Sequence, residues 1–289
     1  MVIVRNKELL VFPIFISMAT VVIFLFFFAP AALWPTGYSY FSVEHWSALF
    51  DRYFTKAGGH GAHDLTASPV AIAYFVFLYL VSMFTATFFN AAFYNEILAA
   101  LSGQEVSLSR GLRFACTRWK AILMWTVFAG LVGLIIKCIE RRSGLVGKII
   151  ARLIGVAWSI ASVFVIPVIV RDEESANPFV TLRKSAEILT RTWGESLIGY
   201  IGIGFINSVA ILGSAMVLAV SIIAATQLHQ PWLVVLEVAA WLLFMFCWSY
   251  LMNVANLVYK GALYLYAAEG VVCEPYDQDL LNSAWKFKS

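Results

Sequence analysis

Side chains that could bind a metal ion gather in one stretch near the N-terminus. Its histidines and acids are Glu44, His45, His60, His63 and Asp64. Two imidazoles beside a carboxylate suit zinc, which in proteins needs three or four converging ligands. The glycines on both sides of His60 disfavour the helix that would bring His60 and His63 to one side. We therefore interpret this stretch as a solvated polar loop and predict no metal ion or other cofactor.

Motifs that would identify an enzyme do not occur in the sequence. It contains no Gly-x-Ser-x-Gly, no His-Glu-x-x-His and no glycine-rich phosphate loop. The four cysteines are scattered without a Cys-x-x-Cys pair, which disfavours a disulfide framework and a zinc site. A net charge of +3 is too small to indicate nucleic-acid binding. We predict that the protein is not an enzyme and does not bind nucleic acid.

A second group of candidates consists of polar side chains near or within long apolar stretches. They are Asn90, Asn95, Glu96, Asn253, Asn256 and Lys260. A polar group is costly in hydrocarbon, so it serves either a function or a hydrogen bond between helices. One interpretation is a polar vestibule that opens to the cytoplasm, with Glu96 and Lys260 as partners. The alternative is that the amides only join neighbouring helices.

The elements that must position these residues are six long apolar stretches. The chain is 61% hydrophobic and 13% charged, whereas a soluble domain carries roughly 25% charged residues. About 20 consecutive apolar residues cross a bilayer as a helix. We therefore predict an all-α fold, a polytopic transmembrane helix bundle that forms a single membrane domain. The expected spans are 9–33, 69–94, 121–137, 149–170, 197–225 and 231–258.

The distribution of lysine and arginine predicts how these spans are oriented. Basic residues are more frequent in the segments that would face the cytoplasm if the N-terminus is cytoplasmic. Both termini are then cytoplasmic, with residues 34–68 as an outer loop and 259–289 as a cytoplasmic tail. The turn between the third and fourth spans is also basic, so the 121–170 hairpin either binds anionic headgroups or does not fully cross. We expect the inner membrane of a bacterium.

Three segments outside the spans have the periodicity of amphipathic helices. Residues 43–54 carry large apolar side chains at helical spacing, which predicts a short helix on the membrane surface. Residues 102–120 and 172–196 each begin with acidic and small polar residues. Each also has a tryptophan just before the next span. We predict that both lie on the cytoplasmic surface. The candidate contacts to lipid headgroups are Arg183, Lys184, Arg191 and Trp193.

The region after the second span contains a further pattern. Its parts are Pro167, Asp172-Glu173-Glu174, Leu182-Arg183-Lys184-Ser185-Ala186, Thr190-Arg191-Thr192-Trp193-Gly194-Glu195 and the segment Ala262–Gly270. On these residues the chain resembles, over roughly residues 90–285, a family of bacterial and archaeal integral membrane proteins of unknown function. The resemblance implies a helical protein with six spans. It implies no activity.

These features indicate a membrane role without naming a reaction. Our first hypothesis is a non-enzymatic membrane component that organises lipids or partner proteins, because surface helices with cations lie beside the spans. The alternative is a channel or transporter for a small solute, which the polar vestibule would serve. The expected partners are membrane lipids and, in a homo-oligomer, further copies of the chain.

Overall fold

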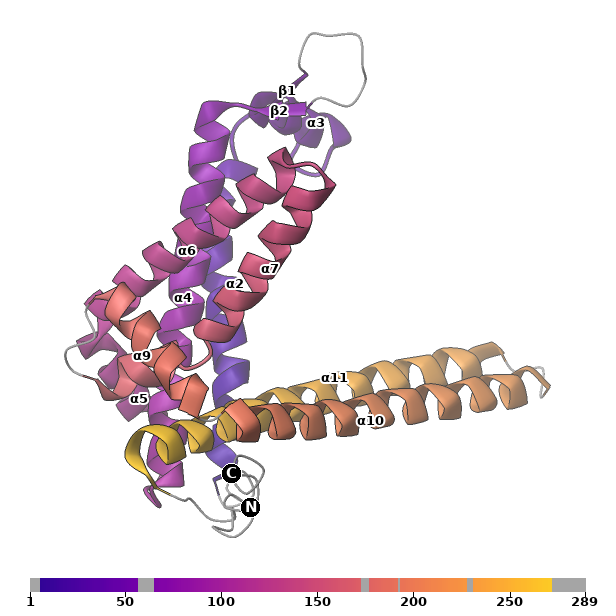
Figure 1. The fold of residues 1–289 in the computed structure, drawn as a ribbon. Helices are drawn as coiled ribbons and strands as arrows, with labels where there is room; N and C mark the ends of the chain where they lie inside the picture. Colours follow the sequence, from indigo (N-terminus) through magenta and orange to yellow (C-terminus); the bar gives the residue numbers. More distant parts are fainter. Residues whose placement is uncertain (1–5, 57–64, 173–176, 192, 228–230, 272–289) are drawn as a thin grey trace.

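The computed structural model describes residues 6–56, 65–172, 177–191, 193–227 and 231–271 (Figure 1). Its N-terminal part contains η1 (Lys7–Leu10), α2 (Val11–Ala32), α3 (Val43–Tyr53), β1 (Phe54–Lys56), β2 (Leu65–Ala67) and α4 (Pro69–Leu101). The remainder contains α5 (Leu108–Thr117), α6 (Trp119–Arg142), α7 (Leu145–Ala161), α8 (Val165–Arg171), α9 (Pro178–Arg191), α10 (Trp193–Gln227), α11 (Pro231–Tyr264) and η2 (Leu265–Glu269).

Among the described residues, six helices or helix runs are long and apolar enough to cross a membrane. They are Lys7–Ala32, Pro69–Leu101, Trp119–Arg142, Leu145–Arg171, Gly204–Gln227 and Trp232–Glu269. The predicted all-α bundle with six candidate spans is thereby confirmed. The third and fourth runs form the hairpin whose crossing the sequence left open, and each has the length that a crossing requires.

Ser68 and Pro69 determine where α4 begins. The Ser68 side chain accepts a hydrogen bond from the Ala71 N–H at 3.2 Å, and Pro69 takes the first helical position, where no N–H is needed. The 33 residues of α4 extend about 50 Å, whereas the hydrocarbon of a bilayer is about 30 Å thick. Part of α4 therefore reaches beyond the hydrocarbon.

The hydrophobic core lies around the C-terminal third of α4, at the end of the molecule that we call the base. The start of α2, the helices α5, α8 and α9, and η2 gather there (Figure 1). The rings of Phe12 in α2 and Phe93 in α4 stack at a centroid distance of 5.2 Å. Leu9 and Leu265 are both buried in this core. The start of the first candidate span and the end of the last therefore lie together at the base.

The helix predicted at 43–54 is confirmed as α3, which lies at the opposite end of the molecule from the base (Figure 1). His45 is fully buried there, with Nε2 3.0 Å from the Ala32 carbonyl oxygen and Nδ1 2.6 Å from the Thr36 hydroxyl. These contacts give His45 a structural role that joins the loop to the end of α2. The antiparallel pair β1–β2, which the sequence analysis did not predict, follows α3.

Of the five candidate metal ligands, the structure describes Glu44 and His45. His60, His63 and Asp64 lie outside the described residues. In the part of the chain that is described, no three His, Cys, Asp or Glu side chains are grouped so that they could hold a metal ion.

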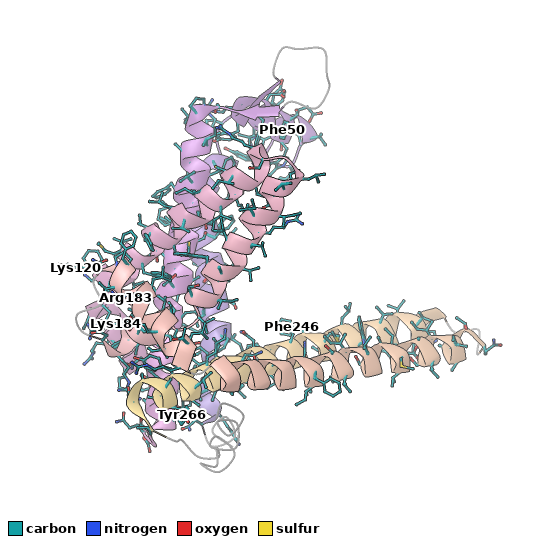
Figure 2. The ribbon with its side chains drawn as sticks, in the orientation of Figure 1. Phe50, Lys120, Arg183, Lys184, Phe246 and Tyr266 are labelled. Carbon is teal, nitrogen blue, oxygen red and sulfur yellow. The ribbon has the colours of Figure 1, made fainter. Side chains whose placement is uncertain are left out.

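Helices α10 and α11 form a long hairpin that runs away from the base at a wide angle to α2, α4, α6 and α7 (Figure 1). Near the base, the Tyr250 hydroxyl donates to the Leu10 carbonyl, and Val254 and Val258 enter the core. Farther out the two helices pack mainly on each other, as in the hydrogen bond from Trp241 Nε1 to Ser214 Oγ at 3.3 Å. The apolar side chains of this part, Phe246 among them, point outward (Figure 2).

The Ser185 side chain of α9 forms hydrogen bonds to the backbone where the chain passes from α7 to α8. Its hydroxyl accepts a hydrogen bond from the Phe164 N–H at 3.0 Å and donates one to the Ala161 carbonyl at 2.6 Å. The residue is fully buried. Ser185→Ala leaves the buried Phe164 N–H and the half-buried Ala161 carbonyl without this partner, so we expect the free energy of unfolding to fall by about 1–3 kcal/mol. Denaturant unfolding in detergent, followed by tryptophan fluorescence, measures this loss.

Ser208→Ala is the matched control for this prediction. The Ser208 hydroxyl is exposed and donates only to the Gly204 carbonyl of its own helix, so its removal leaves no buried group unpaired. An equal loss of stability in the two variants would show that Ser185 does not hold α9 to the α7–α8 break.

Candidate functional site

Glu96 in α4 is a fully buried carboxylate at the base. Arg110 of α5 donates from Nε to Oε1 at 3.0 Å and from Nη2 to Oε2 at 2.6 Å, so the pair is bidentate. The Asn95 side-chain amide donates to Oε1 at 2.9 Å, and the Ser107 N–H donates to Oε2 at 2.7 Å. A buried charge is stable only with partners of this kind. Glu96 therefore fixes both the start of α5 and the direction of Arg110.

The close approach of α5 to α4 depends on Gly111. A Cβ atom at this position would stand 2.8 Å from the Ala92 carbonyl oxygen and 3.0 Å from Glu96 Cγ, which leaves no room for a side chain. With α5 held at this distance, the hydrogen bond to Glu96 raises the pKa of the Arg110 guanidinium above its ordinary value, although partial burial acts in the opposite direction. Arg110 is thus a permanent cation whose guanidinium is fixed in place.

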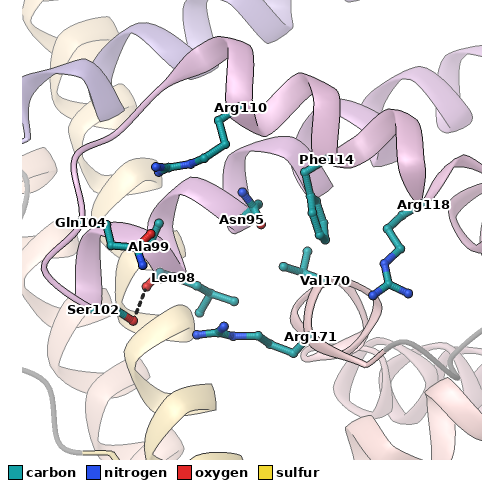
Figure 3. A pocket seen from close by; sticks show the side chains of 10 residues that line it. All are labelled: Asn95, Leu98, Ala99, Ser102, Gln104, Arg110, Phe114, Arg118, Val170 and Arg171. Carbon is teal, nitrogen blue, oxygen red and sulfur yellow. Dashed lines mark hydrogen bonds between the residues drawn. The ribbon is translucent and has the colours of Figure 1, made fainter.

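Three arginines from different parts of the chain line a pocket of about 360 Å³ beside this pair (Figure 3). They are Arg110 in α5, Arg118 between α5 and α6, and Arg171 at the end of α8. Asn95, Ser102 and Gln104 add polar groups, while Leu98, Phe114 and Val170 add apolar ones. Figure 3 shows Phe114 and Val170 between Arg118 and the other polar residues. We call this cavity the arginine pocket.

Carboxylates and carbonyl oxygens hold the arginines of this pocket in place. Arg110 pairs with Glu96, and Arg171 Nε lies 3.2 Å from Glu269 Oε1. Arg118 donates to the Asp172 backbone carbonyl at 3.4 Å, while the Asp172 carboxylate pairs with Lys184. Three guanidinium groups held in this way around one cavity suit an anion with several acceptor oxygens.

The six polar residues named from the sequence do not share one vestibule. Asn95 lines the arginine pocket, and Glu96 lies next to it in a pair with Arg110 rather than with Lys260. Asn253, Asn256 and Lys260 line a different groove of about 400 Å³, on the α10–α11 hairpin. Asn90 is half-buried in α4 and lines neither cavity. The two halves of the expected vestibule are separated because α11 turns away from α4 above the base (Figure 1).

The candidate headgroup contacts lie on α9 and just after it. Arg183 is exposed and pairs with Glu187 at 2.9 Å, and Lys184 pairs with Asp172. Arg183, Lys184 and Lys120 lie on the same side of the base (Figure 2). Arg191 is exposed in the last turn of α9, whereas the side chain of Trp193 lies outside the described residues. Lys184 is linked to the arginine pocket through Asp172, whose backbone carbonyl accepts a hydrogen bond from Arg118.

Sequence reasoning missed Arg110, Arg118 and Arg171 as members of a site. All three were counted only as cytoplasmic charges that orient the spans. One signal was present, because a glutamate at the end of an apolar span needs a cation nearby and Arg110 follows within the next segment. No sequence signal brings Arg171 to the same place, since it lies 61 positions beyond Arg110.

Comparisons with known proteins give one match. The model of a family described as "Family of unknown function (DUF6159)" matches residues 70–273, a region that contains every residue of the arginine pocket. No curated protein and no solved structure matches the chain.

Proposed function

The chain belongs to the DUF6159 family, and we propose that it is a non-enzymatic membrane component that organises lipids by holding an anionic phosphate headgroup in the arginine pocket. The observation that carries this proposal is the set of three arginines around one cavity. Guanidinium groups match phosphate oxygens with paired hydrogen bonds. The family match itself supplies no activity, so the proposal rests on the geometry of the site.

The lining of the pocket suits the phosphate of a phospholipid. Its three guanidinium groups can donate hydrogen bonds to phosphate oxygens. The apolar side chains of Leu98, Phe114 and Val170 would contact the glycerol or the start of the acyl chains. A volume of about 360 Å³ lies within the range of small-molecule sites.

The membrane position that we propose places the base at the cytoplasmic face of a bacterial inner membrane, with both termini in the cytoplasm. The excess of lysine and arginine in the segments at the base supports this orientation. The length of α4 allows the base to extend past the hydrocarbon, so the arginine pocket would lie at headgroup depth. Arg183, Lys184 and Arg191 of α9 would then contact neighbouring headgroups.

Lipid analysis tests the proposal. The full chain, purified from native membranes in a mild detergent, is expected to retain an anionic phospholipid that mass spectrometry identifies. In Arg118→Ala/Arg171→Ala, loss of two charge-assisted contacts should reduce the retained lipid by about tenfold or more. Arg152→Ala is the matched control, because Arg152 pairs with Glu140 on the α6–α7 hairpin and lines no part of the pocket.

Two further measurements separate lipid from free phosphate. Vesicles that contain phosphatidylglycerol should restore lipid to delipidated protein, whereas inorganic phosphate at millimolar concentration should not displace it. If the double variant and the wild-type protein retain equal amounts of anionic lipid, the proposal fails.

The alternative function, a channel or transporter for a small solute, has less support. Its basis was a single polar vestibule, and the six residues that were to form it are divided between separate places. Flux through reconstituted liposomes that falls in an Asn253→Leu/Asn256→Leu variant would favour this alternative.

A further inference from the structure

We propose that the α10–α11 hairpin binds the same hairpin of a second copy of this chain through a polar groove. The groove is formed by Gly204 and Asn207 of α10 and by Ser249, Met252, Asn253, Asn256 and Lys260 of α11, and measures about 400 Å³. This interface is independent of the arginine pocket and of any lipid bound there.

The groove presents side-chain amides to which no group in the described part of the chain is hydrogen-bonded. Asn207 Oδ1 accepts a hydrogen bond from Trp248 Nε1 at 3.1 Å. Within the described residues, no hydrogen bond joins the side-chain amides of Asn253 or Asn256 to another group. Ser249 and Asn253 are both exposed on the hairpin. The groove therefore contains amide donors and acceptors that are open to whatever surrounds the hairpin.

Lipid tails cannot form hydrogen bonds with these side-chain amides. At about 1.5 Å per residue, Asn253 lies about 17 Å along α11 from its end at Tyr264, so a crossing hairpin carries it into the hydrocarbon. An amide without a hydrogen bond there costs several kcal/mol. Ser249 and Asn253 are exposed, so the described part of the chain leaves this side of the groove uncovered.

A second copy fits the groove for two reasons. A side-chain amide is both donor and acceptor, so identical amides related by a twofold axis complement each other. Asn207, Ser249, Asn253 and Asn256 are all neutral, so the approach of an identical surface brings no like charges together along most of the groove. Lys260 lies at the edge of the groove, one turn from the end of α11.

The backbone of α10 also permits a close approach. A Cβ atom at Gly204 would meet nothing within 4 Å, so this glycine is not explained by packing inside the described chain. Small residues on an exposed face let two membrane helices come close enough for hydrogen bonds between them. Gly204 is itself part of the groove wall.

The test is the mass of the protein in a mild detergent and in lipid nanodiscs. We expect the full chain to be a dimer. Asn253→Leu/Asn256→Leu removes four amides from the dimer and should weaken dimerisation by about 50-fold, from the typical strength of hydrogen bonds between membrane helices. Leu251→Ala is the matched control, since Leu251 lies on the opposite side of α11 from Asn253 and should not change the mass.

Disulfide cross-linking gives a second readout that does not depend on stability. In a variant whose native cysteines are replaced by serine, Asn253→Cys should form a covalent dimer in native membranes, and Leu251→Cys should not. A monomer in both detergent and nanodiscs, or a dimer that the double variant leaves intact, would overturn the proposal. A monomer that retains a polar solute or a lipid headgroup at Asn253 would assign the groove to that molecule instead.

Discussion

Arg110→Ala is expected to lower the free energy of unfolding by about 3 kcal/mol, the largest effect of a single side chain at the base. The variant leaves the Glu96 carboxylate buried with only the Asn95 amide and the Ser107 N–H as donors. Removal of one partner of a buried pair costs about 3–5 kcal/mol because the other charge remains in a dry environment. We place the loss at the low end, since two donors to Glu96 persist and the Arg110 side chain is 42% exposed. Denaturant unfolding in detergent measures it.

A double replacement identifies the cause of this loss. Glu96→Leu/Arg110→Leu removes both charges and should be more stable than Arg110→Ala, because no buried charge is left unpaired. Arg110→Lys keeps the charge but cannot form both hydrogen bonds at once, so an intermediate loss is expected. If the double variant is less stable than Arg110→Ala, the carboxylate is not the origin of the effect.

Gly111→Ala is expected to lower the free energy of unfolding by about 2–3 kcal/mol, although it adds a single methyl group. The new Cβ would stand 2.8 Å from the Ala92 carbonyl oxygen, and a backbone atom of α4 cannot rotate out of the way. Helix α5 must therefore shift, which lengthens the hydrogen bonds between Arg110 and Glu96. The same shift moves Arg110 within the arginine pocket, so retention of anionic lipid should fall as well.

Gly204→Ala is the matched control for Gly111→Ala. A Cβ atom at Gly204 meets nothing within 4 Å, and alanine favours the helix over glycine by about 1 kcal/mol. In monomeric protein we expect Gly204→Ala to be neutral or stabilising. If both variants lose the same free energy of unfolding, the loss in Gly111→Ala arises from helix propensity or detergent and not from the contact between α4 and α5.

The sequence predicted much of the local structure because lipid and hydrogen bonding impose simple rules on it. Six apolar stretches of sufficient length had to become helices, since a chain in hydrocarbon must satisfy its backbone groups internally. Apolar residues at helical spacing likewise predicted the helix at 43–54, and two helices preceding the third and fifth spans. These features depend on neighbours along the chain, so composition and periodicity are enough to find them.

The candidate site could not be predicted in the same way. Glu96 was recognised as unusual, but its partner was expected to be Lys260 instead of Arg110, because periodicity does not give the rotation of one helix against another. His45 was grouped with candidate metal ligands, and only the fold placed it against Ala32 and Thr36.

The amino-acid sequence by itself determined that this protein is a bundle of membrane helices and which parts of the chain form them. The tertiary structure alone decided that Arg110, Arg118 and Arg171 surround one pocket and that Asn253 and Asn256 lie apart from it. The physical reason is that hydrocarbon selects for helices through their length and composition, whereas it is nearly indifferent to which apolar faces meet. Close packing decides that choice, through a glycine at 111 and a buried carboxylate at 96.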